Sequence, residues 1–266
     1  MCYYFYSNSL FYAIVSVLVS RCKITTIFRI GKKKIGKMRK CFVSLQNRLS
    51  CKFMIKQFTF NHFGVNCYVV YDETTKECAI IDPAMEATYE DAQLFQFVER
   101  KELAPTLLLL THAHVDHICG LRQTSAKYHL PITMHCDGQK LLRQAEAYGA
   151  MMGFDVTRMD DLDTVHADEG TLLHAGPIDI ECRYVPGHCE GSLCFVIPSE
   201  EAVATGDALF QGSIGRTDLP GGNYPLLIEK LKDRILTLPD NYLVLPGHGE
   251  HSTIGDERKY NPFLNA

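Results

Sequence analysis

Three histidines and an aspartate fall within six consecutive residues, and this cluster constrains the chain more than any other feature. Residues 112–117 read HAHVDH and follow directly after the apolar segment 107–110. Neutral imidazole and carboxylate are ligands that suit zinc, manganese and iron. A chain that leaves a buried strand and enters a loop can direct several such ligands toward one point. We therefore interpret this run as part of a metal-binding site.

The spacing within the run is that of extended chain rather than of a helix. Metal-binding histidines on a helix sit four residues apart, whereas His112 and His114 are two residues apart and project to the same side of an extended segment. Asp116 and His117 can then face a second centre. A single histidine is most often a solvated loop residue, but four donors this close together favour a metal site.

Three later segments supply further ligand candidates, and each ends an apolar run beside a glycine. His188 and His248 each follow a Pro-Gly pair, and Asp207 follows Gly206. In each segment a β-like run carries the backbone to a sheet edge, where the turn leaves a His or an Asp. An aspartate in such a place is more often a turn-former or a helix cap. Its position in this series makes Asp207 a ligand candidate.

Residues 112–117, followed at suitable intervals by the three later donors, resemble the signature of the metallo-β-lactamase superfamily over roughly residues 54–266. The resemblance implies an α/β fold, an αββα sandwich of two central mixed sheets flanked by helices. It also implies two divalent metal ions, with zinc favoured and iron or manganese as alternatives. The family pattern places His112, His114 and His188 on one ion and Asp116, His117 and His248 on the other, with Asp207 as the bridge.

Such a centre predicts a metal-dependent hydrolase. Two cations about 3.5–4 Å apart can share a water and lower its pKa to near neutrality, which makes hydroxide available without a strong base. The same ions act as Lewis acids on a carbonyl or phosphoryl oxygen. The resemblance implies that Asp116 both binds metal and orients the attacking hydroxide, so Asp116 is our candidate catalytic residue.

Two further segments narrow the resemblance within the superfamily. Residues 206–218 (GDALFQGSIGRTD) and the ending around 253–263 resemble the glyoxalase II (hydroxyacylglutathione hydrolase) branch and the related persulfide dioxygenases. We therefore expect cleavage of a small-molecule thioester such as S-lactoylglutathione. Arg216 is the candidate substrate-binding residue, and it either binds a substrate carboxylate or holds the loop through Asp218, the role that we favour. The chain ends 18 residues after His248, so we expect it to lack the helical C-terminal domain with which longer glyoxalase II enzymes bind glutathione.

A mononuclear iron persulfide dioxygenase is the main alternative, because His112, His188 and Asp207 form a two-His, one-carboxylate set that leaves positions open on iron. Nucleases related to this superfamily share the His-rich motif, but in longer chains with added nucleic-acid domains. The acidic charge of residues 54–266 also opposes binding to nucleic acid. A β-lactamase is disfavoured by the Gly-Arg-Thr-Asp segment and by the lack of a clear export signal. A non-catalytic metal-binding module needs only four ligands, fewer than this chain offers.

The charge of the chain changes near residue 53. Residues 1–53 hold 11 Lys and Arg and no Asp or Glu, whereas residues 54–266 hold 16 basic and 31 acidic side chains. We interpret residues 1–53 as a basic N-terminal extension outside the native fold, and residues 54–266 as the catalytic domain. The apolar run 10–19 is short for a membrane span, so a membrane anchor is the less favoured interpretation.

Eleven scattered cysteines predict reduced thiols and a cytoplasmic location. Cys119 and Cys189 are expected to be small apolar residues that fill space beside the ligands.

Hydrophobic periodicity predicts a series of strands that deliver the ligands and helices that cover them. Residues 149–176 are the least regular stretch and are predicted to form a flap beside the active site. Strands are predicted at 56–61, 66–72, 78–82, 106–111, 178–185, 193–197, 202–205 and 242–245. Helices are predicted at 89–103, 120–128, 137–148 and 224–236.

Overall fold

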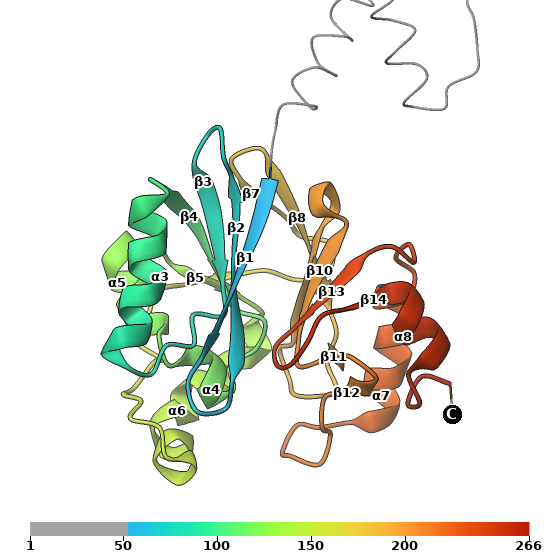
Figure 1. The fold of residues 1–266 in the computed structure, drawn as a ribbon. Coiled ribbons are helices and arrows are strands. Elements are labelled where there is room, and N and C mark those ends of the chain that lie inside the picture. The colour runs from blue at the N-terminus through green and yellow to red at the C-terminus, as the bar shows by residue number, and fades with distance from the viewer. Residues whose placement is uncertain (1–52, 266) are drawn as a thin grey trace, which may run out of the picture. The chain divides into compact units, whose positions relative to one another are not determined.

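The computed structural model describes residues 53–265, which form two six-stranded sheets packed face to face with helices outside them (Figure 1). The first sheet runs in the order in which its strands occur in the chain, and its last three pairs are parallel. Its strands are β1 (Phe53–Phe60), β2 (Val65–Asp72), β3 (Glu77–Ile81), β4 (Ala104–Leu109), β5 (Ile132–Met134) and β6 (Thr164–His166).

The second sheet is mostly antiparallel, with a single parallel pair. Its strands are β7 (Leu172–Ala175), β8 (Ile178–Tyr184), β9 (Leu193–Ile197), β10 (Ala202–Gly206), β13 (Leu243–Pro246) and β14 (Ser252–Thr253). They lie in the order β14-β13-β10-β9-β8-β7, and β10 and β13 are the parallel pair. A separate hairpin of β11 (Leu209–Phe210) and β12 (Ser213–Ile214) follows β10 directly.

Each sheet carries helices on its outer face only (Figure 1). The first sheet is covered by α3 (Thr88–Arg100), α4 (Val115–Ile118), α5 (Leu121–Tyr128) and α6 (Gln139–Met152). The second is covered by α7 (Tyr224–Lys230), which continues into the π-helical turn η4 (Leu231–Ile235), and by α8 (Ile254–Tyr260). Short 3₁₀ turns lie at η2 (Cys136–Gly138) and η3 (Pro198–Glu200).

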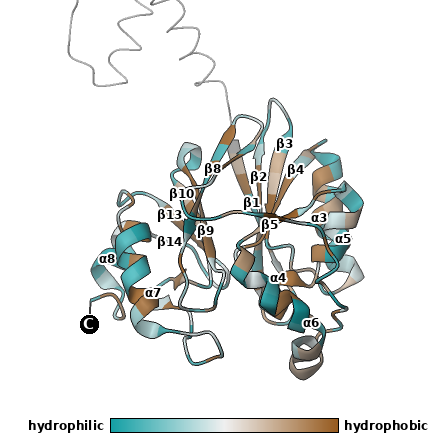
Figure 2. Cartoon of the chain, turned by 180° about the vertical axis from the view of Figure 1, so that it is seen from behind, coloured by the Kyte–Doolittle hydropathy of each residue, from teal (hydrophilic) through white to brown (hydrophobic). Residues whose placement is uncertain are grey.

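Strand alternation divides the interior into three layers of core. Successive side chains of a strand point to opposite faces. Leu108 of β4 therefore packs under the first group of helices, while Leu109 packs between the sheets. On β9, Phe195 fills the same space between the sheets, while Val196 faces α7 and α8. Because both faces of the inner strands are covered, these strands are continuously apolar, and Figure 2 shows the apolar residues gathered along them. The predicted αββα sandwich is confirmed.

The predicted strands and helices all occur, with end points shifted by a few residues. The short strands β5, β6, β7, β11, β12 and β14 and the short helices α4 and α8 were not predicted. The prediction for residues 149–176 is wrong in part, because this stretch includes the end of α6 and the edge strands β6 and β7. Its irregular middle holds the buried side chains of Phe154 and Met159. The basic extension at 1–53 lies, apart from its last residue, outside the described residues, so the division of the chain stays a prediction.

No helix within residues 53–265 is long and apolar enough to cross a membrane.

The inter-sheet core predicts a large effect for a truncation at its centre. Phe195 is fully buried between the sheets, so Phe195→Ala should lower the free energy of unfolding by about 3–5 kcal/mol through lost burial and an unfilled cavity. Urea denaturation measures this loss. Phe263→Ala is the matched control, since that ring is 40% exposed. Equal stability of the two variants would contradict the assigned core.

Candidate metal centre

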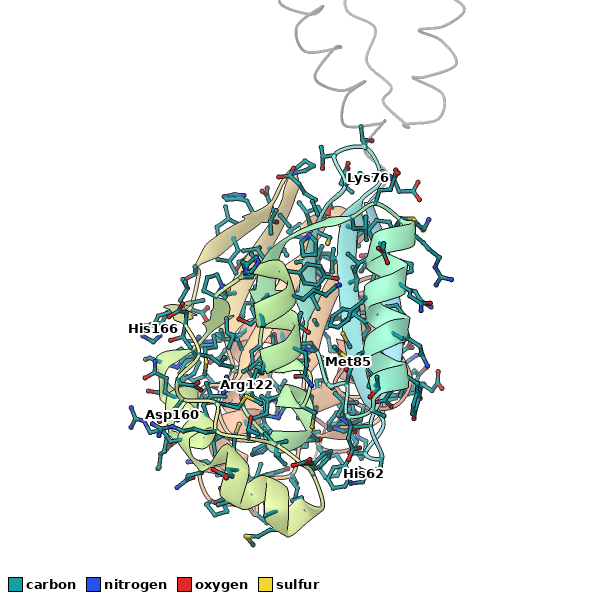
Figure 3. The ribbon with its side chains drawn as sticks, turned by 90° about the vertical axis from the view of Figure 1, so that its left-hand side faces the viewer. His62, Lys76, Met85, Arg122, Asp160 and His166 are labelled. Atoms are coloured by element: carbon teal, nitrogen blue, oxygen red, sulfur yellow. The ribbon has the colours of Figure 1, made fainter. Side chains whose placement is uncertain are left out.

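The seven predicted donors come together where strands of both sheets end. His112 and His114 follow β4, Asp207 follows β10, and His248 follows β13. Figure 3 places His62, in the β1–β2 turn, at the opposite end of the molecule from Lys76 in the β2–β3 turn. The donors lie at the His62 end, because Val65 at the start of β2 pairs with His248 in an isolated β-bridge.

Backbone hydrogen bonds join the two sheets at this edge. Leu193 of β9 donates to the carbonyl of Thr111, with an N–O distance of 2.8 Å. Asn66 of β2 donates to the carbonyl of Gly247 at 2.7 Å. The Asn66 side chain also donates to the carbonyls of Pro246 and Gly249. The segments that carry His112 and His248 are thus fixed to strands of the opposite sheet, which brings ligands from both sheets to one point.

His112, His114 and His188 form the first donor group. His114 Nδ1 and His188 Nε2 are 2.9 Å apart, and the His112 ring lies 4.7 and 5.0 Å from the other two rings. The donor atoms of the three residues lie within 4.8 Å of one another, and Cys189 Sγ belongs to the same group. The three imidazoles therefore converge as the predicted ligands of one cation would.

Asp116, His117 and His248 form the second donor group, and Asp207 lies between the two groups. Asp116 Oδ2 is 3.3 Å from His248 Nε2, and Asp207 Oδ1 is 3.3 Å from His117 Nε2. Asp207 Oδ2 reaches both sides, at 3.7 Å from His188 Nε2 and 3.6 Å from His248 Nε2. The structure therefore brings all seven predicted residues together, with Asp207 between the two groups.

Three buried atoms at the centre of this cluster lack a hydrogen-bond partner among the described residues: His112 Nε2, His117 Nε2 and Asp207 Oδ1. Buried polar atoms normally have partners, because leaving one without a partner costs about 1–3 kcal/mol. Each of these atoms is a lone-pair donor that suits a divalent cation. The residues present therefore fit the metal ions that the fold implies.

Burial keeps the first group neutral. It lowers the pKa of His112 well below the usual value, with the neighbouring His117 as the next cause. Burial and the neighbouring His188 lower the pKa of His114 to about 4, and burial also lowers the pKa of His188. Neutral imidazole is the form that binds metal, so these three ligands are ready to do so at neutral pH.

The carboxylates of Asp116 and Asp207 favour positive charge on the histidines of the second group. Burial alone would lower the pKa of His117, but the carboxylates of Asp207 and Asp116 outweigh it and raise that pKa well above the usual range. Burial would likewise raise the pKa of Asp207, but His117 outweighs it and holds that pKa well below the usual range. Burial would also lower the pKa of His248, but the bond to Asp116 and the charges of Asp207 and Asp116 together raise it. A cation that binds here takes over the role of these protons.

Asp82 is the functional residue that the sequence reasoning missed. Its Oδ2 lies 2.9 Å from His117 Nδ1 and accepts from Thr111 Oγ1 at 2.6 Å, while Oδ1 accepts from the Thr111 amide at 2.7 Å. Thr111 Oγ1 in turn lies 3.1 Å from His112 Nδ1. Asp82 thus orients a ligand of each group. The available signal was its position directly after the buried strand β3, the pattern that identified Asp207.

Backbone carbonyls orient the two histidines that follow Pro-Gly pairs. His188 Nδ1 lies 2.8 Å from the carbonyl oxygen of Arg216, and His248 Nδ1 lies 3.1 Å from that of Phe63. A bond at Nδ1 fixes the imidazole so that Nε2 faces the centre. Gly247 is required for a different reason, because a Cβ there would overlap Asp207 Oδ1.

The same residues define a known family. Residues 61–248 match the family described as the metallo-beta-lactamase superfamily. The chain belongs to this superfamily. Among curated proteins, it is 38% identical over 192 residues to the probable metallo-hydrolase YqgX of Bacillus subtilis, covering 71% of this chain and 88% of the relative. It is 35% identical over 206 residues to the hydroxyacylglutathione hydrolase GloC of Haemophilus influenzae, covering 77% and 94%.

Solved structures agree with this assignment. The B3 metallo-beta-lactamase BLEG-1 has a TM-score of 0.73 and 33% identity, over 80% of this chain and all of the neighbour. TTHA1623, solved in a di-iron-bound form, has a TM-score of 0.70 and 33% identity, over 79% of this chain and all of the neighbour. ETHE1 from Myxococcus xanthus has a TM-score of 0.65 at 24% identity, over 80% and 85%, and shows the shared fold. The chain is therefore a metallo-hydrolase of this superfamily.

An open cleft of about 430 Å³ leads to the metal centre of this superfamily member. Phe210, Ser213 and Arg216 line it beside the ligands. The guanidinium of Arg216 donates to both carboxylate oxygens of Asp218, at 2.8 and 2.7 Å. This contact favours the loop-holding role over the substrate-binding role, which stays a prediction. Both cysteines near the ligands, Cys119 and Cys189, are buried.

Loss of the Asp82 carboxylate should weaken metal binding. In Asp82→Asn, His117 and Thr111 lose a charged partner, so metal affinity should fall by about 10- to 100-fold. Competition with a chromophoric chelator measures the affinity. Asp179→Asn is the control, because Asp179 pairs with His174 at an exposed site far along the chain. Unchanged affinity in Asp82→Asn would show that His117 needs no such partner.

Metal binding should also release protons. His117 and His248 have raised pKa values in the metal-free protein, so each is protonated at a pH where an ordinary histidine is not. A metal ion must displace these protons, and metal affinity should therefore rise with pH, by about tenfold per pH unit for each proton displaced. Titration in a weakly buffered indicator solution counts the protons. Affinity that is flat from pH 6 to 8 would contradict the protonated state of His117.

Proposed function

We propose that this chain is a thioester hydrolase that cleaves a small-molecule thioester such as S-lactoylglutathione. The observation that carries the proposal is the convergence of six donors in two groups around a seventh, Asp207, with three atoms of this cluster buried and without a hydrogen-bond partner. The relationship to GloC, named as a hydroxyacylglutathione hydrolase, supports the substrate class, since the alignment covers 94% of that protein. The free state of the seven cysteines within residues 53–265 supports a reducing, cytoplasmic location.

The residues around the centre suit this reaction. When bound, two divalent cations, zinc in our proposal, would supply a water of lowered pKa and a Lewis acid for the thioester carbonyl. Asp116, whose carboxylate lies 3.3 Å from His248, would accept the proton of the attacking water and orient it. The reaction forms the carbonyl C–O bond, breaks the C–S bond and releases a carboxylic acid and a thiol. Residues lining the open cleft hold the substrate while its carbonyl faces the centre.

An iron persulfide dioxygenase is the second candidate. His112, His188 and Asp207 supply the two-His, one-carboxylate set, with His112 Nε2 and Asp207 Oδ1 unpartnered. TTHA1623, at 33% identity, was solved in a di-iron-bound form, which supports iron as a metal that this fold can bind. Metal analysis and oxygen uptake separate the candidates: iron with oxygen consumption on glutathione persulfide favours the dioxygenase, and zinc with thioester cleavage favours the hydrolase. Nitrocefin belongs in the same panel because BLEG-1 is named a metallo-beta-lactamase.

Asp116→Asn tests the proposed hydrolysis. The amide cannot accept a proton from the attacking water, so kcat for S-lactoylglutathione should fall by about 10²–10⁴-fold, the usual contribution of a general base. Steady-state kinetics on metal-loaded protein measure the loss, and metal content is measured on the same samples. The fold should persist, since Asp116 contributes its side chain to the site rather than to the apolar core.

The control for this variant is Asp179→Asn, an exposed carboxylate that should leave kcat unchanged. Retained turnover in Asp116→Asn would exclude Asp116 as the proton acceptor. Failure of the metal-loaded wild-type protein to cleave any thioester would exclude the proposed substrate class.

A further inference from the structure

The β11–β12 hairpin begins two residues after Asp207 and forms one wall of the cleft. Phe210 and Ser213 line the cleft, and the ring centroid of Phe210 lies 6.2 Å from that of His248. Each strand of the hairpin has only two residues. A two-stranded ribbon is at best marginally stable by itself, so its position depends on what it is attached to.

Two buried polar residues hold this hairpin: Glu257 of α8 and Asn261, the residue that follows the last residue of this helix. Glu257 Oε2 accepts from the Gly212 amide at 2.9 Å, and Asn261 Nδ2 donates to the Ser213 carbonyl at 3.0 Å. The two side chains also bond to each other, with Asn261 Nδ2 2.7 Å from Glu257 Oε2. Their exposed fractions are 2% and 0%. A carboxylate and an amide are costly to bury without partners, and these partners are the backbone of the hairpin.

The hairpin is in turn connected to two ligands. On its near side, Asp207 precedes it by two residues. On its far side, the chain continues to Arg216, whose carbonyl oxygen is 2.8 Å from His188 Nδ1. Gly215 lies between the end of the hairpin and Arg216, and it is so close to the Asp207 carbonyl that a Cβ on Gly215 would overlap it. The hairpin therefore has little freedom where it meets the metal centre, and its outer turn at Gly212 is the part that α8 controls.

We propose that Glu257 and Asn261 are positioning residues that hold the β11–β12 hairpin as the substrate-binding wall of the metal centre. They act on the substrate through Phe210 and Ser213, the hairpin residues that face it. This inference rests on the proposed function, since it assigns the wall to binding of a thioester. Substrate affinity, rather than the chemical step, is what the two residues govern.

The test uses Asn261→Ala and Glu257→Ala in the full, metal-loaded chain. Each variant removes hairpin bonds, so KM for S-lactoylglutathione should rise about five- to tenfold as the hairpin spends part of its time open. The kcat and the metal content should stay close to the wild-type values. Hydrogen exchange followed by mass spectrometry should show faster exchange in residues 209–216 and unchanged exchange in β9.

Two further variants serve as controls. Glu257→Gln keeps an oxygen that can accept from the Gly212 amide, and it should restore most of the wild-type KM. Thr253→Ala removes the cap of the same helix, where Thr253 Oγ1 accepts from the Asp256 amide at 3.1 Å, and it leaves the hairpin bonds in place. It should leave both KM and hairpin exchange unchanged.

Unchanged KM or unchanged hairpin exchange in both alanine variants overturns the proposal. So does loss of metal at constant KM, because the pair would then support the ligands instead of the wall. These results are distinct from failure of the proposed function, in which the wild-type protein cleaves no thioester. In that case the two alanine variants should still show faster hydrogen exchange in residues 209–216, because they lose the bonds to the hairpin. Unchanged exchange in both variants would overturn the positioning role.

Discussion

The demand of buried carboxylates for positive charge is the constraint on which this site depends. Asp116 and Asp207 lie among histidines at the junction of two sheets, and together they hold the pKa of His117 well above its usual range. Charges of one sign are expensive in such a place unless they are paired. Bound divalent cations would satisfy this demand and would also give the unpartnered atoms of His112, His117 and Asp207 a partner. Metal binding and the integrity of this edge of the sandwich are therefore linked.

The sandwich meets this constraint by fixing strand ends to one another. Ligands come from segments that are far apart in the chain, and a shift of a few tenths of an ångström at any of them would disturb the set. Bonds from Leu193 to Thr111 and from Asn66 to Gly247 tie the loops of one sheet to the strands of the other. The inter-sheet core around Phe195 holds the two sheets together behind them. Stability and function therefore depend on the same contact between sheets.

The cleft wall formed by the β11–β12 hairpin is held in place differently from the metal ligands. The ligands are held by the strands that carry them, whereas the β11–β12 hairpin is held by side chains of α8 and of the residue that follows it, some 45 residues later in the chain. Glu257 and Asn261 belong to the C-terminal segment that resembles the glyoxalase II branch and the related persulfide dioxygenases. Their contacts give that resemblance a physical meaning, because the segment shapes the cleft without supplying a metal ligand.

Much of the site was predictable because it depends on local chemistry. A run such as HAHVDH after an apolar strand has few uses other than metal binding, and β-like runs that end in Pro-Gly-His or Gly-Asp place a donor at a sheet edge whatever the rest of the fold. The long strands and helices were predictable from their periodicity. Strands of two or three residues, such as β5 and β14, carry too few side chains to show a period, and they form only because a neighbouring strand supplies hydrogen bonds.

The sequence by itself therefore determined the ligand types, their positions at strand ends and the layered fold. Only the tertiary structure decided that the seven donors converge, that Asp82 orients His117, and that Glu257 and Asn261 reach the hairpin. The reason is that donor identity and strand period are properties of neighbouring residues. Contacts between side chains more than 30 residues apart depend instead on how the sheets and helices pack, and no local pattern records that packing.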